Sequence, residues 1–486
     1  MGSWQALYRS RGPQSGGTTL KRLYVIAACA AVLAALFAGA GSAGEFRGAW
    51  LSAWNDGYFT AEQIDNTIAA AKKANLTALF IQVRKNGDAY YKSQTEPRGN
   101  GIADDFDPLA TVIEKAHAQG LEVHAWVNSC RMWASKTPPT SPKHIVNRHP
   151  EWINKNFAGT NRASEGLYVD PGIPEAREYV AGIFEEIAKS YNVDGVHMDY
   201  IRYPNTQWGY SDLALKQYYA DTGATTRPEA SDPKFMQWKR DQVTALVTLI
   251  RKKVKAAKPN IVLSASTIPW GDCPDDFTKS SPYAQVCQDW RKWAAEGLID
   301  ANCPMNYKQE SSTKAAKMFR NWLAGFAKWR ALKPVYVGIE VHMNNPAESV
   351  QQIEAIRKAN LDGFVLFSFN QSAGRTKLVE ALAAGPCSTP SKRSVVASGD
   401  PPAKAAFDQG IKYAVANRLD LAKQSFGEAV RLDPSYTEAY FRLGRCMVRE
   451  MNYVEARGMF EKTLQLDPSH KGAQTELKAI VDKNPS

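Results

Sequence analysis

The stretch Asp194-Gly-Val-His-Met-Asp199-Tyr-Ile-Arg202-Tyr-Pro204 decides the fold. Its apolar start predicts a buried parallel strand, residues 193–199, along which alternate side chains share one side. That side becomes polar only toward its carboxyl end, at His197 and Asp199. Because a buried carboxylate is costly unless it is paired or solvated, we expect Asp199 at the carboxyl-end rim of an α/β barrel, where side chains meet substrate. The alternative is a structural ion pair with Arg202 that holds a loop.

The chain around this stretch alternates strand and helix patterns from Glu45 to about Gly385. Eight such units predict an α/β protein, a (β/α)8 TIM barrel with long loops. A doubly wound open sheet is the alternative, but no GxGxxG or phosphate loop follows the first strand. The strands are expected at residues 46–54, 76–84, 121–128, 193–199, 261–267, 299–306, 335–340 and 363–370.

Polar and aromatic side chains gather at the expected carboxyl ends of these strands. Since those ends meet at one rim of a parallel barrel, we expect a single site there. Asp199 and Glu340 are the expected catalytic residues. The residues expected to bind substrate are Arg84, His124, Trp126, Asn128, His197, Arg202, Tyr203, Asn306, Tyr307 and Asn370.

Two acids at one rim, among many aromatic residues, point to glycoside cleavage. One carboxyl group protonates the leaving oxygen, and the other acts as nucleophile or as base toward water. Asp199 suits the second role and Glu340 the first, with Asp272 and Glu310 as alternatives for the first. No metal or cofactor is expected, because no familiar ligand spacing occurs. A non-catalytic glycan-binding barrel is a second hypothesis, and an esterase, without a GxSxG motif, is a weaker third.

Five motifs in this region resemble those of one known family. They are Arg84-Lys-Asn-Gly-Asp-Ala-Tyr-Tyr-Lys-Ser93 with Glu96-Pro97, His124-Ala-Trp-Val-Asn128, Asp194 to Pro204, Gln288-Asp-Trp290 and Cys303-Pro-Met-Asn-Tyr307. Residues 45–385 thus resemble the bacterial glycosyl-hydrolase-like 10 family. The resemblance implies a TIM-barrel glycoside hydrolase, exported or lipid-anchored, with Asp199 as its fourth-strand catalytic acid. It also implies peptidoglycan glycan strands stripped of peptides as a substrate class, since at least one branch of the family acts on them. The role of Glu340 depends on its position alone.

The first 43 residues have the pattern of a secretory signal. Lys21-Arg22 precede an apolar run, and Gly41-Ser-Ala43 offers small residues for cleavage. We therefore expect an exported protein, periplasmic or extracellular, which an uncleaved leader would anchor in a membrane. The net charge of +11 includes four basic leader residues, and no Lys/Arg run indicates a nucleic-acid partner.

An exported protein can form disulfides, and six cysteines follow the leader. Cys273 and Cys287 fall in one expected loop region and are the best candidate pair. Free buried thiols are the equally good alternative.

The C-terminal part contains a repeat behind a Pro- and Ser-rich linker, residues 386–402. Arg-Leu-Asp-Pro434 recurs 34 residues later as Gln-Leu-Asp-Pro468, a period typical of tetratricopeptide repeats. Residues 403–483 are expected to form two such repeats and a capping helix. Such an array binds a protein or peptide partner or, alternatively, serves packing or oligomerisation.

Overall fold

The computed structural model describes residues 44–331, 333–391, 402–415 and 418–483. The expected leader and most of the expected linker, residues 392–401, lie outside the described residues. Within the described ranges, no helix combines the length and apolar character that crossing a membrane requires.

Eight parallel strands form a closed barrel, which confirms the predicted TIM-barrel fold. Hydrogen bonds connect them in the order β8-β7-β6-β3-β2-β1-β10-β9. Parallel bridges from Asn302 to Val335 and from Met305 to Gly338 join β8 to β9 and close the ring. The strands are β1 (Phe46–Leu51), β2 (Ala78–Arg84), β3 (Glu122–Asn128), β6 (Gly195–Asp199), β7 (Val262–Thr267), β8 (Ala301–Pro304), β9 (Tyr336–Glu340) and β10 (Gly363–Phe367).

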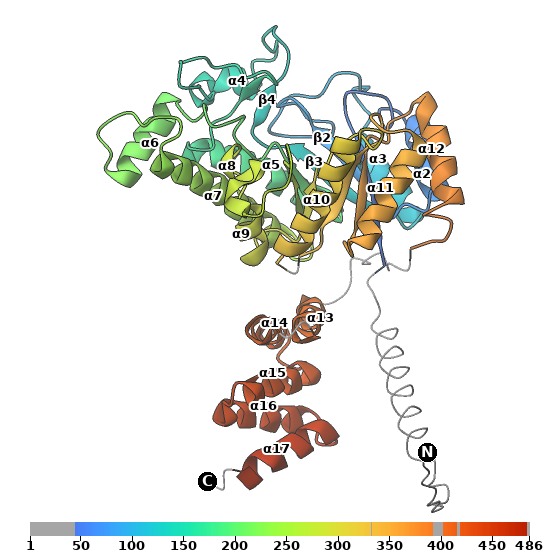
Figure 1. The fold of residues 1–486 in the computed structure, drawn as a ribbon, viewed down its shortest axis with the longest axis vertical. Coiled ribbons are helices and arrows are strands. Elements are labelled where there is room, and N and C mark those ends of the chain that lie inside the picture. The colour runs from blue at the N-terminus through green and yellow to red at the C-terminus, as the bar shows by residue number, and fades with distance from the viewer. Residues whose placement is uncertain (1–43, 332, 392–401, 416–417, 484–486) are drawn as a thin grey trace, which may run out of the picture. The chain divides into compact units, whose positions relative to one another are not determined.

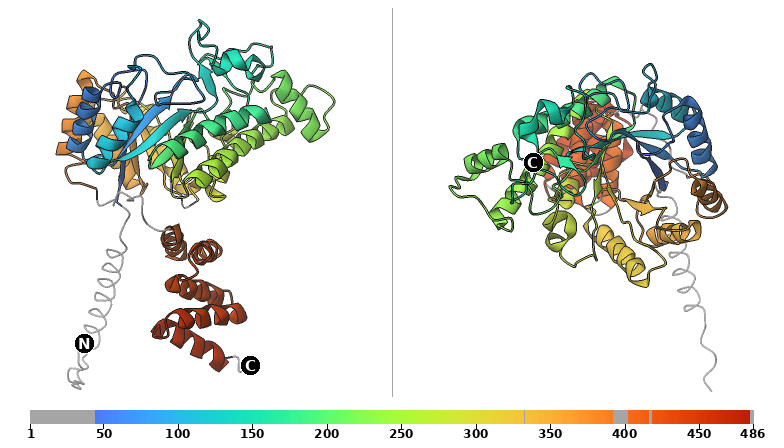
Figure 2. Two further views of the ribbon diagram at one scale, coloured as in Figure 1. Left: turned by 180° about the vertical axis from the view of Figure 1, so that it is seen from behind. Right: turned by 90° about the horizontal axis from the view of Figure 1, so that it is seen from above.

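Helices lie around the outside of the strands, and α5 and α7 lie side by side (Figures 1 and 2). Most begin at a residue whose side chain accepts a backbone N–H of the first turn, such as Asp107 before α3. Asn345 and Glu348 form a reciprocal capping box at the start of α11. The longer helices are α2 (Ala61–Lys73), α3 (Pro108–Ala118), α5 (Pro174–Ser190), α6 (Asp212–Thr222), α7 (Pro233–Ala257), α9 (Trp290–Ala295), α10 (Thr313–Trp329), α11 (Pro346–Lys358) and α12 (Ala373–Ala384).

The inner face of the barrel carries the alternate residues that the two-residue period predicts. Phe46, Trp50 and Phe80 fill its interior, with Tyr336 stacked on Phe46 at a ring separation of 3.9 Å. Gly195 leaves room for His124, since a Cβ there would lie 2.1 Å from that ring's Nδ1. Residues of β6 that lie two or four positions after Gly195, which include Asp199, therefore face the barrel axis.

Three strands end earlier than the pattern predicts: β1, β8 at Pro304 and β10 at Phe367. The expected first strand reaches residue 54, but β1 ends at Leu51. The side-chain oxygen of Asn370 accepts the Ser52 N–H at 2.9 Å, and that of Gln82 accepts the Ala53 N–H at 2.9 Å. These amide side chains replace the sheet partners of the backbone and turn the chain into the rim loop.

The long excursion after β3 folds over the carboxyl ends of the strands. It contains the antiparallel pair β4 (Arg131–Trp133) and β5 (Leu167–Tyr168), and the short helix α4 (Ile145–Arg148). β4 and α4 lie at the top of Figure 1. Because β4 starts three residues after β3 ends, its side chains lie at the same rim as Asp199.

The predicted disulfide between Cys273 and Cys287 is wrong. All six cysteines of the described residues are free thiols. Cys287 is fully buried, whereas Cys273 is half-buried beside Gly325 of α10. The structure therefore has the free thiols that were the alternative.

The C-terminal residues form helices with the spacing that the repeat predicts. Gly410 and Gly444, 34 residues apart, make the same close approach. A Cβ at Gly410 would lie 2.5 Å from the Phe426 ring, and one at Gly444 would lie 2.7 Å from the Phe460 ring. The helices are α13 (Pro402–Val415), α14 (Leu419–Leu432), α15 (Thr437–Arg449), α16 (Tyr453–Leu466) and α17 (Lys471–Lys483).

Candidate active site

Asp199 ends β6 with its carboxylate held by two donors. The indole N–H of Trp126, on the neighbouring strand β3, donates to Oδ2 at 3.0 Å. The backbone N–H of Tyr200 donates to Oδ1 at 2.7 Å, from a residue with φ of +49°. The two bonds fix the orientation of the carboxylate of a residue that is only 5% exposed.

Burial raises the pKa of Asp199 above its usual value, while the positive charges of Arg202 and Arg131 and its hydrogen bonds work against that shift. Asp199 forms no ion pair with any described residue. Arg202 instead places one terminal nitrogen 3.1 Å from each carboxylate oxygen of Glu165. Arg202 therefore pairs with Glu165 and does not form the structural ion pair with Asp199 that was the alternative.

Glu340 ends β9 in a different environment. Its side chain is nearly buried, and Oε1 accepts the backbone N–H of His342 at 3.0 Å. No cation among the described residues pairs with it. Burial raises its pKa to about 7, and the bond from His342 only partly offsets this. A carboxyl group with such a pKa holds its proton near neutral pH, as a general acid requires.

The two alternatives to Glu340 lie in other settings. Glu310 is paired with Arg320, at 2.6 Å, and is also contacted by Gln352. Asp272 is exposed and accepts hydrogen bonds from Asn321 and from the Cys273 backbone. Glu310 is thus held by an ion pair and Asp272 lies in open solvent, whereas Glu340 is buried at the end of β9 and unpaired among the described residues.

An aromatic cluster connects the two acids. Trp126, which holds Asp199, meets the Phe367 ring edge-on at 6.3 Å, and Phe367 lies opposite Glu340 in the strand register. Tyr307 stacks on Phe367 at 5.4 Å. Burial and the negative charges of both Glu340 and Asp199 raise the pKa of Tyr307 well above its usual value. The two carboxyl groups therefore share one aromatic floor at the barrel mouth.

Two of the predicted binding residues, His197 and His124, lie deeper in the barrel, and a third, Asn128, lies beside Asp199 in the strand register. His197 contacts the Ser264 and Ser266 hydroxyls, each at 2.8 Å, and burial holds its pKa well below the usual value. His124 contacts Glu122 at 3.1 Å. Asn128 accepts a hydrogen bond from Gln82 and donates one to the Lys85 carbonyl. These buried side chains support the layer that carries Asp199.

Four other predicted binding residues make internal contacts, and substrate binding by them stays a prediction. Arg84 is fully buried against Glu96. The Tyr203 hydroxyl donates to Asp170, and the Asn306 amide donates to the Phe319 carbonyl on α10. Asn370 is bound to the backbone of the loop after β1. Their polar groups hold rim loops and helices in place.

The sequence reasoning missed Arg131, Glu165 and Tyr200. All three lie outside the expected strands, in or beside the long excursion, where no periodicity places a side chain. The only signal for Arg131 was its position just after the polar end of the third strand. Within the described residues, no group of three or more His, Cys, Asp or Glu side chains is arranged to hold a metal ion.

Comparison with known proteins finds relatives of the barrel. The sequence is 31% identical over 315 residues to glycosyl hydrolase YngK of Bacillus subtilis, covering 60% of this chain and 59% of that protein. It is 25% identical over 294 residues to glycosyl hydrolase DigH of Escherichia coli K12, covering 55% of this chain and 63% of that protein. The matches thus span about three fifths of each relative.

The fold is shared with a solved structure, the PgaB (BpsB) glycoside hydrolase domain from Bordetella bronchiseptica. The TM-score is 0.54 at 14% identity, over 70% of this chain and 98% of that domain. The Glycosyl hydrolase-like 10 family profile matches residues 45–356, which is nearly the whole barrel. The chain therefore belongs to the Glycosyl hydrolase-like 10 family.

Proposed function

We propose that the barrel is a glycoside hydrolase that cleaves O-glycosyl bonds with Asp199 and Glu340. The observation that carries this proposal is the contrast between the two acids around Tyr307. Asp199 has two hydrogen-bond donors and two nearby arginines, whereas Glu340 has one donor and a pKa near 7. Burial raises the pKa of both carboxyl groups, but only Asp199 has a second donor and arginines that work against the shift, which suits Asp199 to the base or nucleophile role and Glu340 to the acid role.

Each carboxyl group has a defined step in this proposal. Glu340, protonated, gives its proton to the oxygen of the leaving sugar as the glycosidic bond breaks. Asp199, ionised, attacks the anomeric carbon or removes a proton from the water that attacks it. The Trp126 and Tyr200 donors keep Asp199 aimed and ionised, and the aromatic floor supports the apolar face of the sugar ring.

We propose a polysaccharide of the cell wall as substrate, with the glycan strands of peptidoglycan favoured. Two strongly exposed tryptophans at the carboxyl ends of β1 and β7 support an extended ligand: Trp54 is 50% exposed and Trp270 42%. Sugar rings stack on such faces, and stacking sites on two sides of the acids favour cleavage within a chain. Similarity to the two glycosyl hydrolases supports the reaction class.

Product analysis tests this proposal. The purified protein is incubated with intact peptidoglycan, peptide-free glycan strands, chitin and plant polysaccharides, and the products are identified by mass spectrometry. We expect oligosaccharides of several lengths from the peptide-free strands. Single sugars alone would contradict internal cleavage, and no product from any polymer would contradict hydrolysis.

The second candidate is a barrel that binds glycan without cleaving it. The predominance of buried, internally paired polar side chains over open ones around Asp199 favours it. Retention of an oligosaccharide during long incubation, with no new reducing ends, would support this candidate over the hydrolase.

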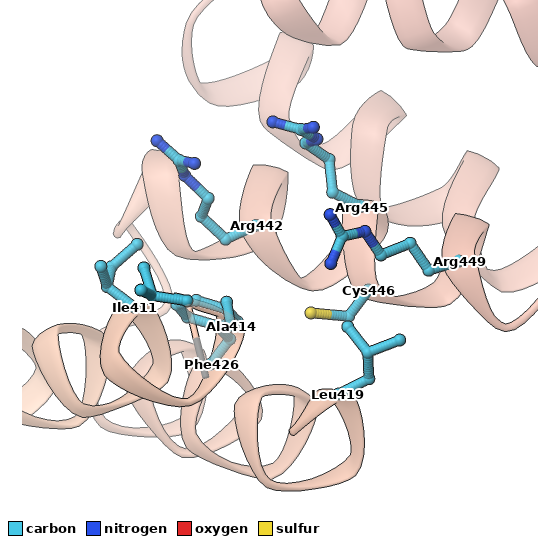
Figure 3. A pocket seen from close by; sticks show the side chains of 9 residues that line it. Ile411, Ala414, Leu419, Phe426, Arg442, Arg445, Cys446 and Arg449 are labelled. Carbon is cyan, nitrogen blue, oxygen red and sulfur yellow. The ribbon is translucent and has the colours of Figure 1, made fainter. Parts of the chain in front are cut away.

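We also propose that the repeat module binds an acidic protein segment that carries an apolar side chain. α13, α14 and α15 surround a cavity of about 370 Å³ (Figure 3). Leu419 and Phe426 give it apolar walls, while Arg442, Arg445 and Arg449 project from α15. Arg442 pairs with Glu438 and Arg445 with Glu476, but Arg449 has no ion pair within the described residues. The positive charge of Arg449 beside an apolar hollow complements such a segment.

A peptide-binding measurement tests this proposal. A fluorescent peptide with two glutamates beside a leucine is titrated with the full chain, and a lysine version serves as the probe of opposite charge. We expect binding of the acidic peptide that Arg449→Glu weakens. Arg457→Glu, on the exposed side of α16, is the matched control. Equal binding of both peptides, or equal loss in both variants, would contradict the proposal.

We propose an exported location, which the basic and apolar pattern of residues 1–43 supports. Cell fractionation with N-terminal sequencing of the mature protein tests it. A cytoplasmic protein with an intact N-terminus would contradict it.

A further inference from the structure

Cations and aromatic rings alternate along the barrel rim beside Asp199. The guanidinium carbon of Arg131 lies 5.5 Å from the centre of the Trp54 ring and 5.1 Å from that of Tyr200. The guanidinium carbon of Arg202 lies 4.8 Å from Tyr200 and 5.6 Å from Trp270. These five residues, here called the rim row, connect the two exposed tryptophans across the mouth of the barrel.

The two arginines of the rim row differ in how their charge is balanced. Arg202 has a carboxylate partner, Glu165, at 3.1 Å. Arg131 donates only through Nε, to the backbone carbonyl of Glu165 at 2.8 Å. Its terminal nitrogens have no hydrogen bond or ion pair within the described part of the chain. Arg131 is thus a fixed cation whose outer donors are free.

The position of Arg131 makes these free donors significant. Arg131 as a whole residue is only 7% exposed, so water screens its charge less than that of a surface arginine. The charge acts on Asp199, whose carboxyl group it helps to keep ionised. A bound anion on the terminal nitrogens would therefore lie beside the reacting sugar. The planar guanidinium group presents two parallel N–H donors, which match the two oxygens of a carboxylate.

Trp54 completes a binding surface for a charged sugar. The residue is half exposed, and two cations contact its ring. One is the guanidinium group of Arg131, and the other is the Lys85 ammonium, which lies 4.5 Å from the ring centre. Lys85 is itself held by a hydrogen bond to the Ala53 carbonyl at 2.8 Å. A sugar that stacks on Trp54 would place its substituents between these two cations.

We propose that Arg131 binds the carboxylate of an acidic sugar residue of the glycan, with the sugar ring stacked on Trp54. This inference rests on the proposed function, since it assumes that a glycan occupies the barrel mouth. It makes Arg131 a specificity-determining residue that selects carboxylate-bearing strands over neutral polymers of the same backbone. The alternative is that Arg131 only holds the excursion against β6.

Binding to three matched oligosaccharides separates these alternatives. The probes are a peptide-free peptidoglycan oligosaccharide with free carboxylates, the same compound with its carboxylates reduced to alcohols, and a chitin oligosaccharide of equal length. Affinities are measured by calorimetry on the full chain carrying Asp199→Asn, which prevents turnover. We expect the carboxylate form to bind about tenfold more tightly than the reduced form, a preference that added salt weakens.

Arg131→Gln in the same background should abolish this preference and leave binding of the reduced and chitin probes unchanged. Arg131→Lys should keep part of it, because the charge remains. Lys136→Gln, an exposed cation of the same excursion, is the control and should change nothing. Thermal unfolding shows whether each variant is folded. If Arg131→Gln does not fold, Arg131→Lys and Trp54→Ala still give the test, since Trp54→Ala should weaken binding of all three probes.

The outcomes separate this inference from the proposed function. Equal affinity for the carboxylate and reduced forms, or equal loss for all probes in Arg131→Gln, overturns the inference and leaves the hydrolase intact. A carboxylate preference that depends on Arg131, together with no hydrolysis by the unmodified protein, overturns the hydrolase and leaves the inference intact. No binding of any probe overturns both.

Discussion

The indole N–H of Trp126 points at Oδ2 of Asp199 from the neighbouring strand, at 3.0 Å. The strand register fixes this relationship, because Trp126 is paired with His197, two residues before Asp199 on the same inner face. A neutral donor at this position stabilises the ionised carboxylate without competing for its proton. Trp126 is thus the side chain that orients Asp199 for the base or nucleophile role that we propose for it.

Trp126→Phe should shift the acid side of the pH profile. Loss of the indole donor removes a bond that favours ionised Asp199, so its pKa rises further and activity falls at a higher pH than in the parent protein. A hydrogen bond to a charged group is worth about 1.5–3 kcal/mol, so the rate should fall about ten- to a hundredfold. The measurement is kcat/KM against pH.

Trp50→Phe is the matched control, because that indole donates to His197 instead of Asp199. In this variant, the fall of kcat/KM on the acid side should occur at the same pH as in the parent protein. An unchanged acid limb in Trp126→Phe would contradict the role given to this bond.

Glu340→Gln should remove the basic side of the pH profile. Because the pKa of Glu340 is about 7, the proton that it donates is lost above neutral pH, and activity of the parent protein should decline there. The variant should have low activity without this decline. Glu310→Gln, which replaces the carboxyl group paired with Arg320, should keep it. If Glu310→Gln removed the decline above neutral pH and Glu340→Gln did not, Glu310 and not Glu340 would be the proton donor.

The same group predicts the direction of a stability change with pH. The pKa of Glu340 is raised on folding, so its folded form holds the proton more tightly than the unfolded form. Its contribution to stability is complete below its ordinary pKa of 4.5 and is lost as pH rises through about 7. Glu340→Gln should flatten this decline, as thermal unfolding across that pH range would show. A steeper decline in the variant would contradict the assignment.

Glu96→Gln should destabilise the barrel and leave Asp199 and Glu340 in place. Arg84 and Glu96 are fully buried and 2.6 Å apart, so the variant leaves a buried guanidinium without its carboxylate. Breaking a buried pair in this way costs about 3–5 kcal/mol. The exposed pair of Lys292 and Glu296 gives the control, since Glu296→Gln should cost at most about 1 kcal/mol. Urea unfolding followed by tryptophan fluorescence measures both, and equal effects would contradict the account.

The sequence was sufficient to predict the barrel and the inner face of its strands. The two-residue period along β6 placed Asp199 on the axis side, and the same period placed Glu340 there on β9. These predictions depend only on backbone geometry, which repeats regularly. The strand ends were harder, because side-chain amides from Gln82 and Asn370 capture the backbone after β1.

The partners of the arginines were beyond prediction from the sequence. Arg84 and Arg202 were both expected to face substrate, but Glu96 and Glu165 neutralise them. Both glutamates lie in loops without periodicity, so nothing in the pattern reports which cation each one meets. The contact of Asn306 was also beyond prediction: it follows the end of β8 at Pro304, and its amide donates to the Phe319 carbonyl on α10, whereas Tyr307 stacks on Phe367.

The central claim is that Asp199 takes part in glycosidic cleavage, and release of reducing ends from peptide-free glycan strands tests it most directly. We expect release by the parent protein and by Asp272→Asn, whose exposed carboxyl group lies on the loop after β7. In Asp199→Asn, folded as judged by its unfolding transition, release should fall at least about a thousandfold. Release at the parent rate in folded Asp199→Asn would contradict the claim.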